Sequence, residues 1–310
     1  LPGTTGEDGQ PVAVTTQDYA PAEVVKPKDG KKVKIGASFP LLDQFLQNVA
    51  NSIKARGEAA GAEVSVTSAE EKIEVQLNQI ENFIASGVDA LIVLPQDTAT
   101  TAQITQKAKA ANIPLVYVNR RPTDLPKGVP YVGSDSLVAG QLEMEQLAKL
   151  SNHQGNVAIL QGDPTQEAAQ QRTKGCEEIA AKYDMKVVFN QTGLWMRDKG
   201  LALAENLIQS GQQVDVICAN NDEMALGAIN AFENAGMLDK VLVGGVDATG
   251  DALTAMAAGK LEVTVFQDAK GQGQAGVDTA IRMINGGEGP DVINVPYQLV
   301  TPENMSQFQQ

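Results

Sequence analysis

Short apolar segments alternate with segments of helical periodicity along most of the chain. Apolar runs of five or six residues, such as residues 90–95, have the length of buried strands. Between such runs, apolar side chains recur at spacings of three and four, which places them on one face of a helix; the clearest case is Ile73, Leu77, Ile80 and Ile84. This alternation predicts repeated strand–helix units.

The predicted strands form two sets. The first set covers residues 33–38, 63–68, 90–95, 113–119 and 131–134, and the second covers residues 156–161, 186–190, 214–219, 241–246 and 263–267. A helical segment over 268–286 and a last strand over 293–300 follow. Strands joined through helices pair in parallel by right-handed crossovers. The pattern therefore predicts an α/β fold with two doubly wound parallel-sheet lobes.

The helix and strand beyond the second set suggest that the chain returns to the first lobe, so that several strands cross between the lobes as a hinge. Residues 1–32 are rich in Gly, Pro, Thr and charge, and we expect a flexible tail there. The predicted N-terminal lobe comprises residues 33–134 and 268–296, and the predicted C-terminal lobe comprises residues 135–267 and 297–310. A length of 310 residues also favours two domains.

Charge and hydropathy exclude several partners. A formal charge of −14 repels phosphate backbones and anionic lipid headgroups, so we expect no nucleic acid and no membrane surface as partner. The longest apolar runs are far shorter than the roughly 20 residues that cross a bilayer, so we expect a soluble protein without membrane insertion. The start of the sequence fits either a cytoplasmic protein or a mature form whose signal peptide has been removed.

Cysteine and histidine usage argues against metal and triad chemistry. Cys176 and Cys218 lack the spacing of a zinc site, and their apolar surroundings favour buried free thiols over a disulfide. His153, the only histidine, lies in a Ser-Asn-His-Gln-Gly turn and is expected to be solvated. We therefore expect no metal and no cofactor.

Polar motifs follow several predicted strands, where open α/β sheets bind ligands. They are NNDEMALGA at 220–228, Asn119-Arg120 after a strand, LQG at 160–162 leading to Arg172, and GGVDATGDAL at 244–253. With these motifs, the chain from about residue 33 to residue 300 resembles the periplasmic sugar-binding proteins of ABC importers, of the ribose-binding type. The resemblance implies a ligand cleft between the two lobes.

The resemblance also implies contact positions. Arg120 and Arg172 match arginines that hydrogen-bond to vicinal hydroxyls, which suits a planar guanidinium. Asn119 stands where ribose binders usually have Asp, which points away from strict ribose specificity. The other matches are a polar pair at strand ends in the second lobe, an amide at a lobe crossing and an aromatic ring that stacks on the sugar: Asn221 and Asp247, Gln267, and Trp195.

The first loop departs from the family pattern. Ribose binders carry an Asn and two Phe there, whereas this chain has Asp43, Gln44 and Phe45, of which only Phe45 keeps an aromatic ring. The two polar side chains would suit a hexose or a cyclitol such as inositol. A loop Asp is, however, more often a helix cap than a ligand contact.

We therefore expect a non-catalytic, monomeric receptor for a neutral monosaccharide or cyclitol, periplasmic or extracellular and tethered through its tail, which docks on an ABC transporter permease. Two alternatives have the same fold type. The effector half of a sugar-responsive repressor would need a DNA-binding module before residue 33. An NAD-dependent enzyme would need its glycine motif at the start of a βαβ unit, but GQGQAG at 271–276 follows the last strand of the second set.

Overall fold

The computed structural model describes residues 4–5, 11–12 and 14–309, and the chain divides into two units. Unit 1 comprises Leu1–Ser134 and Asp268–Pro296, and unit 2 comprises Asp135–Gln267 and Tyr297–Gln310. The chain thus passes from one unit to the other after Ser134, after Gln267 and after Pro296. Within the described residues, no helix has the length and hydropathy needed to cross a bilayer.

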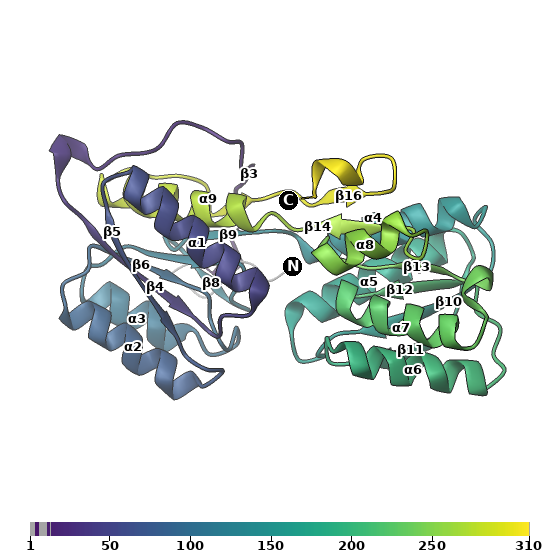
Figure 1. Cartoon of the computed structure of the whole chain (residues 1–310). Coiled ribbons are helices and arrows are strands. Elements are labelled where there is room, and N and C mark those ends of the chain that lie inside the picture. Colours follow the sequence, from purple (N-terminus) through teal and green to yellow (C-terminus); the bar gives the residue numbers. More distant parts are fainter. Residues whose placement is uncertain (1–3, 6–10, 13, 310) are drawn as a thin grey trace. The chain divides into compact units, whose positions relative to one another are not determined.

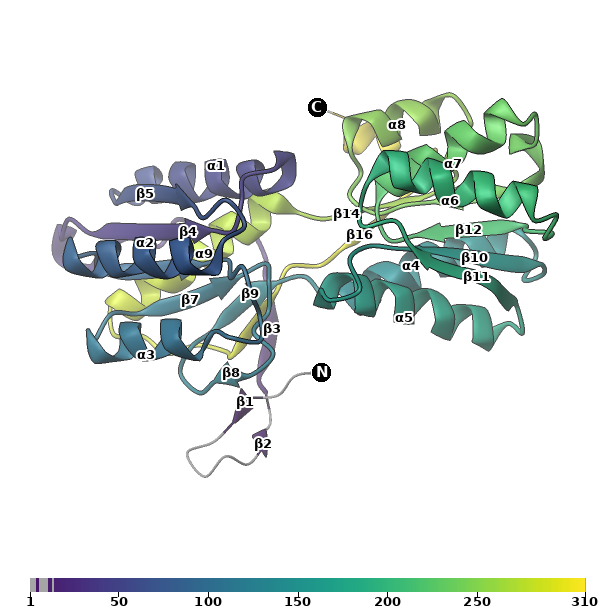
Figure 2. The same cartoon turned by 90° about the horizontal axis from the view of Figure 1, so that it is seen from below.

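Unit 1 is built on a seven-stranded parallel sheet of order β3-β15-β9-β7-β6-β4-β5 (Figure 1). Its strands are β3 (Thr16–Asp18), β4 (Lys34–Phe39), β5 (Glu63–Ser68), β6 (Ala90–Val93), β7 (Leu115–Val118), β9 (Tyr131–Gly133) and β15 (Val292–Asn294). Helices cover both of its faces, as the sequence pattern predicted (Figure 2). One face carries α1 (Gln44–Ala59) and α9 (Ala269–Ile284), and the other carries α2 (Ile73–Ala85) and α3 (Ala102–Ala110).

The N-terminal segment differs from the prediction of a flexible tail, which is wrong for residues 14–32. Strand β3 pairs in parallel with β15, and Tyr19, Val24 and Val25 pack against the core of unit 1. Backbone pairing at a sheet edge and single apolar contacts need no sequence periodicity, so composition alone did not reveal them. Before residue 14, β1 (Thr4–Thr5) and β2 (Pro11–Val12) form a small sheet with β8 (Leu125–Pro126), and the rest lies outside the described residues.

Unit 2 contains a four-stranded parallel sheet of order β11-β10-β12-β13. Its strands are β10 (Asn156–Gln161), β11 (Lys186–Thr192), β12 (Val216–Ala219) and β13 (Leu242–Gly244). Figure 1 shows helices on both faces. The helices of unit 2 are α4 (Ser136–Leu150), α5 (Glu167–Lys182), α6 (Arg197–Gln209), α7 (Asp222–Asn234) and α8 (Gly250–Ala257). The described residues also contain the short 3-10 helices η1 (Lys28–Gly30), η2 (Leu238–Lys240) and η3 (Met305–Gln307).

The last predicted strand, residues 293–300, is divided in the structure. Its first half forms β15 in unit 1, and its second half, β16 (Gln298–Val300), pairs antiparallel with β14 (Thr264–Phe266) in unit 2. Pro296 lies between the two halves and cannot donate a ladder hydrogen bond, so pairing stops there. Isolated bridges join Gly244 to Val263 and Asp247 to Phe266.

Glycines allow the helix pairs to pack at close range. A Cβ at Gly140 in α4 would lie 2.2 Å from the backbone oxygen of Arg172 in α5, and one at Gly175 would lie 2.6 Å from the Leu137 oxygen. The GQGQAG segment serves the same purpose in α9, because a Cβ at Gly273 would lie 2.6 Å from Ser52 Cβ. These glycines are packing positions. Gly140 and Gly175 let α4 and α5 approach closely, and this contact fixes the position of the Arg172 backbone.

We predict that Gly140→Ala lowers the free energy of unfolding by at least about 2 kcal/mol, because the added methyl group meets a backbone carbonyl that cannot turn away. Urea unfolding at neutral pH checks this. Gly250→Ala is the matched control, since a Cβ at Gly250 has no heavy atom within 4 Å. Equal stability of the two variants would contradict the account of α4–α5 packing.

Candidate functional site

Arg172 is the central side chain of the polar cluster at the carboxyl ends of the unit 2 strands. It lies in α5 and is 5% exposed. Its Nη1 donates to the backbone carbonyl of Asn220 (3.0 Å), directly after β12, and its Nη2 donates to the Tyr297 hydroxyl (3.1 Å). Its Nε is buried and has no hydrogen-bond partner among the described residues. The guanidinium is therefore oriented by protein while part of its donor capacity is unused.

Trp195 lies beside Arg172. The guanidinium carbon is 5.6 Å from the Trp195 ring centroid, within cation–π range. Trp195 Nε1 donates to Gln166 Oε1 (2.9 Å), and the ring lies against the backbone of Gly162, where a Cβ would come within 2.2 Å of it. The LQG motif thus provides the space that the indole occupies.

Two asparagines follow β12 and have different environments. Asn220 is fully buried, and its Oδ1 accepts from the Gly162 N–H (2.9 Å) and the Thr173 hydroxyl (3.2 Å). Asn221 is the N-cap of α7: its Oδ1 accepts from Met224 N (3.0 Å), and its Nδ2 donates to the Trp195 carbonyl (3.1 Å). Asn221 therefore fixes the Trp195 loop with an amide that the sequence analysis assigned to the ligand.

The remaining predicted residues of unit 2, Asp247 and Gln267, lie after β13 and β14. Asp247 follows β13, and its backbone N–H donates to Val265 O in β14 (2.8 Å). Burial acts to lower the pKa of Arg172, but Tyr297 and Asp247 outweigh it and the pKa is raised. Gln267 directly follows β14 and is the last residue of this part of unit 2.

Three of the ten predicted site residues have left-handed backbone conformations without being glycine. These are Asn119 (φ 66°), Trp195 (φ 70°) and Asp247 (φ 123°). Such conformations are uncommon for residues with a side chain, and they concentrate at ligand clamps and active sites. Positive φ also occurs at turn residues elsewhere in the chain, such as Asn112 and Asp184, so the functional role of the three loops stays a prediction.

Two buried carboxyl groups, those of Asp222 and Glu143, underlie the cluster, and no motif in the sequence marks either of them as a buried acid. Asp222 accepts from the Thr264 hydroxyl (2.7 Å) and from Thr249 N (2.9 Å), and Gly245 leaves room for it. Burial and the neighbouring Asp247 raise the pKa of Asp222 to about 8. Burial and Asp222 likewise raise the pKa of Glu143 well above its usual value, so both groups favour the neutral form.

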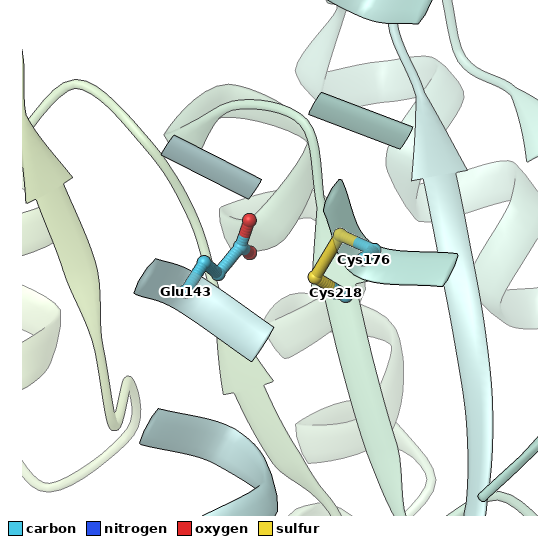
Figure 3. Close-up of side chains that lie close together, drawn as sticks. All are labelled: Glu143, Cys176 and Cys218. Atoms are coloured by element: carbon cyan, nitrogen blue, oxygen red, sulfur yellow. A yellow bond between two sulfur atoms is a disulfide. The ribbon is translucent and has the colours of Figure 1, made fainter. Parts of the chain in front are cut away.

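The expectation of free thiols is wrong, because Cys176 in α5 and Cys218 in β12 form a disulfide across 42 residues. Burial in apolar surroundings is common to free thiols and disulfides, so the sequence could not distinguish them. Figure 3 shows the Glu143 side chain beside this disulfide. Among the described residues these three side chains form the one group with metal-ligand spacing. Because the two sulfurs are bonded to each other, only one carboxyl group remains as a ligand.

In unit 1, Asn119 and Arg120 follow β7. Asn119 Nδ2 donates to Gln272 Oε1 (2.9 Å), and the Asn119 carbonyl accepts from the Tyr131 hydroxyl (2.8 Å). Gln272 is fully buried and also donates to Ser134 Oγ (3.1 Å), so α9 holds the Asn119 loop in place. Burial lowers the pKa of Arg120, although Asp43 and Glu71 act against this shift.

The predicted residues Asp43, Gln44 and Phe45 lie where the loop after β4 enters α1. Asp43 is the N-cap of α1 and accepts from Leu46 N (2.8 Å), in agreement with the helix-cap alternative. Phe45 packs against the core of unit 1, and Gln44 is exposed. Asp43 nevertheless acts electrostatically on the Arg120 guanidinium, which links the two loops.

Comparison with known proteins identifies the family of the chain. Residues 35–288 match the periplasmic binding protein domain family, and the chain belongs to that family. A Rhizobium meliloti protein named for rhizopine binding is 40% identical over 284 residues, covering 89% of this chain and 92% of that protein. The fold is accordingly the two-lobed α/β fold of this family, as the motifs had suggested.

Two solved structures extend the comparison. An ABC transporter solute-binding protein from Bacillus halodurans, with bound myo-inositol, is 41% identical with a TM-score of 0.82, covering 91% of this chain and 99% of that chain. A periplasmic solute-binding protein from Actinobacillus succinogenes, with bound D-allose, is 31% identical with a TM-score of 0.83, covering 89% and 99%. Both bound molecules are neutral polyols.

We predict that Asp222→Asn reduces the pH dependence of stability between about pH 4 and pH 8. The folded state binds the Asp222 proton more tightly than the unfolded state does, so the free energy of unfolding falls as pH rises from the ordinary pKa of 3.8 to about 8. Removing this group should reduce the slope by up to about 1.4 kcal/mol per pH unit. Urea unfolding across this range measures the slope.

The matched control is Asp251→Asn, which removes a carboxyl that is 71% exposed and pairs with Arg197. Its slope should equal that of the unchanged protein. An unchanged slope in Asp222→Asn as well would show that Asp222 is ionised in the folded state throughout the range.

Proposed function

We propose that this chain is the solute receptor of an ABC importer and binds a neutral cyclitol or monosaccharide, with myo-inositol as the first candidate. The observation that carries the proposal is the buried, pre-oriented Arg172 guanidinium with a donor not used by the protein, beside an indole ring. A fixed fork of donors suits two adjacent hydroxyls, and an aromatic face suits the C–H face of a ring.

The charge of the cluster favours an uncharged ligand. Arg172 is offset by Asp247, while burial raises the pKa of Asp222 to about 8 and raises the pKa of Glu143 well above its usual value, so both groups favour the neutral form. An anionic or cationic ligand would therefore meet little net opposite charge. Polyol hydroxyls both donate and accept, and Arg172, Asp247 and Gln267 together offer donors and acceptors.

The relatives support the ligand class. The Bacillus halodurans structure, at 41% identity, was solved with myo-inositol, and the Actinobacillus succinogenes structure was solved with D-allose. We infer that the Arg172 cluster of unit 2 contacts the polyol, and we keep Asn119 and Arg120 of unit 1 as the contact positions that the family resemblance implies. Closure of two lobes around a ligand would then produce the form that a transporter permease recognises.

Membership of this family also implies a location on the outer side of the cytoplasmic membrane, in the periplasm or outside the cell. We propose that the receptor acts there as a monomer and that the N-terminal segment connects it to the membrane. Of the two alternatives, a repressor effector domain and an NAD-dependent enzyme, neither agrees with relatives that are solute-binding proteins.

We predict that one neutral polyol raises the melting temperature in a panel of myo-inositol, other inositols, ribose, allose, glucose and NAD at millimolar concentration. A ligand at 1,000 times its dissociation constant adds about 4 kcal/mol to the free energy of unfolding, which is easily measured. A shift with NAD alone would overturn the proposal in favour of an enzyme, and no shift with any polyol would remove the proposed ligand class.

Two variants test whether the shift comes from the proposed residues. Arg120→Ala should lose most of the shift, because it removes the half-buried guanidinium after β7. Arg282→Ala, in the exposed last turn of α9, is the matched control and should retain the shift. An equal shift in both variants would exclude Arg120 from the site.

A further inference from the structure

The Tyr297 hydroxyl holds a ligand-binding arginine of the proposed function. It accepts from Arg172 Nη2 at 3.1 Å, and the guanidinium carbon is 6.0 Å from the Tyr297 ring centroid. Tyr297 is 8% exposed, and 125 residues separate it from Arg172 in the sequence. It is also the first residue of unit 2 after the chain leaves unit 1 at Pro296.

The Tyr297 ring has a separate packing role that explains its fixed position. It lies in a small apolar cluster with Ala139 of α4, Val246 and Val265, with Leu142 packed against it. Val246 directly precedes Asp247, and Val265 lies in β14. An aliphatic residue would fill this cluster as well, so packing alone does not account for a phenol whose hydroxyl meets the guanidinium.

The arginine needs such a partner because its side chain is long and because the contact with the Trp195 ring does not by itself fix the orientation of the guanidinium. Arg carries about 2 kcal/mol of rotamer entropy, and a ligand that had to order it would bind correspondingly more weakly. The Asn220 carbonyl fixes Nη1, the Tyr297 hydroxyl fixes Nη2, and the Trp195 ring lies 5.6 Å away from the guanidinium carbon. With both terminal nitrogens held, the plane of the guanidinium is determined before a ligand binds.

We propose that Tyr297 is a positioning residue for polyol binding, which orients the Arg172 guanidinium against Trp195 and so prepares it for the ligand. The effect of Tyr297 on ligand affinity rests on the proposed function. The effect of Tyr297 on the geometry of Arg172 and Trp195 does not depend on any ligand, and the two effects are measured separately.

The test is Tyr297→Phe, which keeps the ring and removes the hydroxyl. Trp195 is the only tryptophan of the chain, so emission excited at 295 nm reports on the Arg172–Trp195 contact. We expect the emission of ligand-free protein to change in intensity or wavelength, and we expect affinity for the polyol that stabilises the unchanged protein to fall about tenfold in calorimetry.

Tyr183→Phe is the matched control. Tyr183 is the C-cap residue of α5, at the opposite end of this helix from the Trp195 loop, and its hydroxyl donates to Glu145. The substitution therefore also removes one hydroxyl hydrogen bond. It should leave both the emission and the affinity unchanged. A loss of melting temperature alone in Tyr297→Phe, with emission and affinity unchanged, would show that Tyr297 has only a structural role and would overturn the proposal.

A double-mutant cycle with Arg172→Lys shows whether the effect passes through the arginine. A lysine cannot make two fixed hydrogen bonds with the geometry of a guanidinium. Tyr297→Phe should therefore cost much less affinity in the Arg172→Lys background than in the unchanged protein. Equal costs in both backgrounds would contradict positioning through Arg172. If no polyol binds the unchanged protein, the proposed function fails, and the emission change alone decides whether Tyr297 orients Arg172.

Discussion

The arrangement of unit 2 depends on one buried cation, the guanidinium of Arg172. A charge that is 5% exposed is costly unless it is paired and hydrogen-bonded. Here the end of β12 supplies a backbone carbonyl, the C-terminal segment supplies a phenol, and Asp247 supplies opposite charge. Elements from four parts of the sequence therefore have to come together around Arg172, and their meeting point is the carboxyl edge of the sheet.

The same constraint explains the buried acids. With Asp247 offsetting Arg172, further negative charge nearby is unfavourable, and burial raises the pKa values of Asp222 and Glu143. Asp222 nevertheless keeps hydrogen bonds from Thr249 and Thr264, so it connects α7 to the segments after β13 and in β14. Asp222 is thus hydrogen-bonded, whereas both carboxyl oxygens of Glu143 are buried without a hydrogen-bond partner among the described residues. Acids that favour the neutral form beside a single oriented cation agree with the proposal of an uncharged ligand.

Much of the fold was predictable from the sequence because the strands of both sheets are buried and apolar and the helices between them have one apolar face. Strands β5 and β10 have the predicted boundaries, residues 63–68 and 156–161. The N-terminal segment was not predictable, because β3 is held by backbone pairing with β15 and not by an apolar pattern. The division of residues 293–300 at Pro296 could have been found from the proline itself, which ends a strand in the sequence as it does in the structure.

The site was predictable to the extent that its residues lie in loops after strands, or, for Arg172, in the helix that follows β10. Arg172, Trp195, Asn220 and Asp247 come together in unit 2 because parallel strands share one carboxyl edge. The partners that orient them could not be found in the same way. Tyr297 is 125 residues from Arg172. Gln272 is 153 residues from Asn119. Neither lies in a motif that signals a contact, so only the folded chain reveals these pairs.

The central claim is that the Arg172 guanidinium, as oriented by Asn220 and Tyr297, binds adjacent hydroxyls of a neutral polyol. A crystal structure of the chain with myo-inositol tests it most directly. The account predicts two ring oxygen substituents within hydrogen-bond distance of Arg172 nitrogens, with the bonds to Asn220 and Tyr297 retained and the ring against Trp195. A polyol bound away from Arg172, or an Arg172 that leaves Tyr297 to reach the ligand, would contradict it.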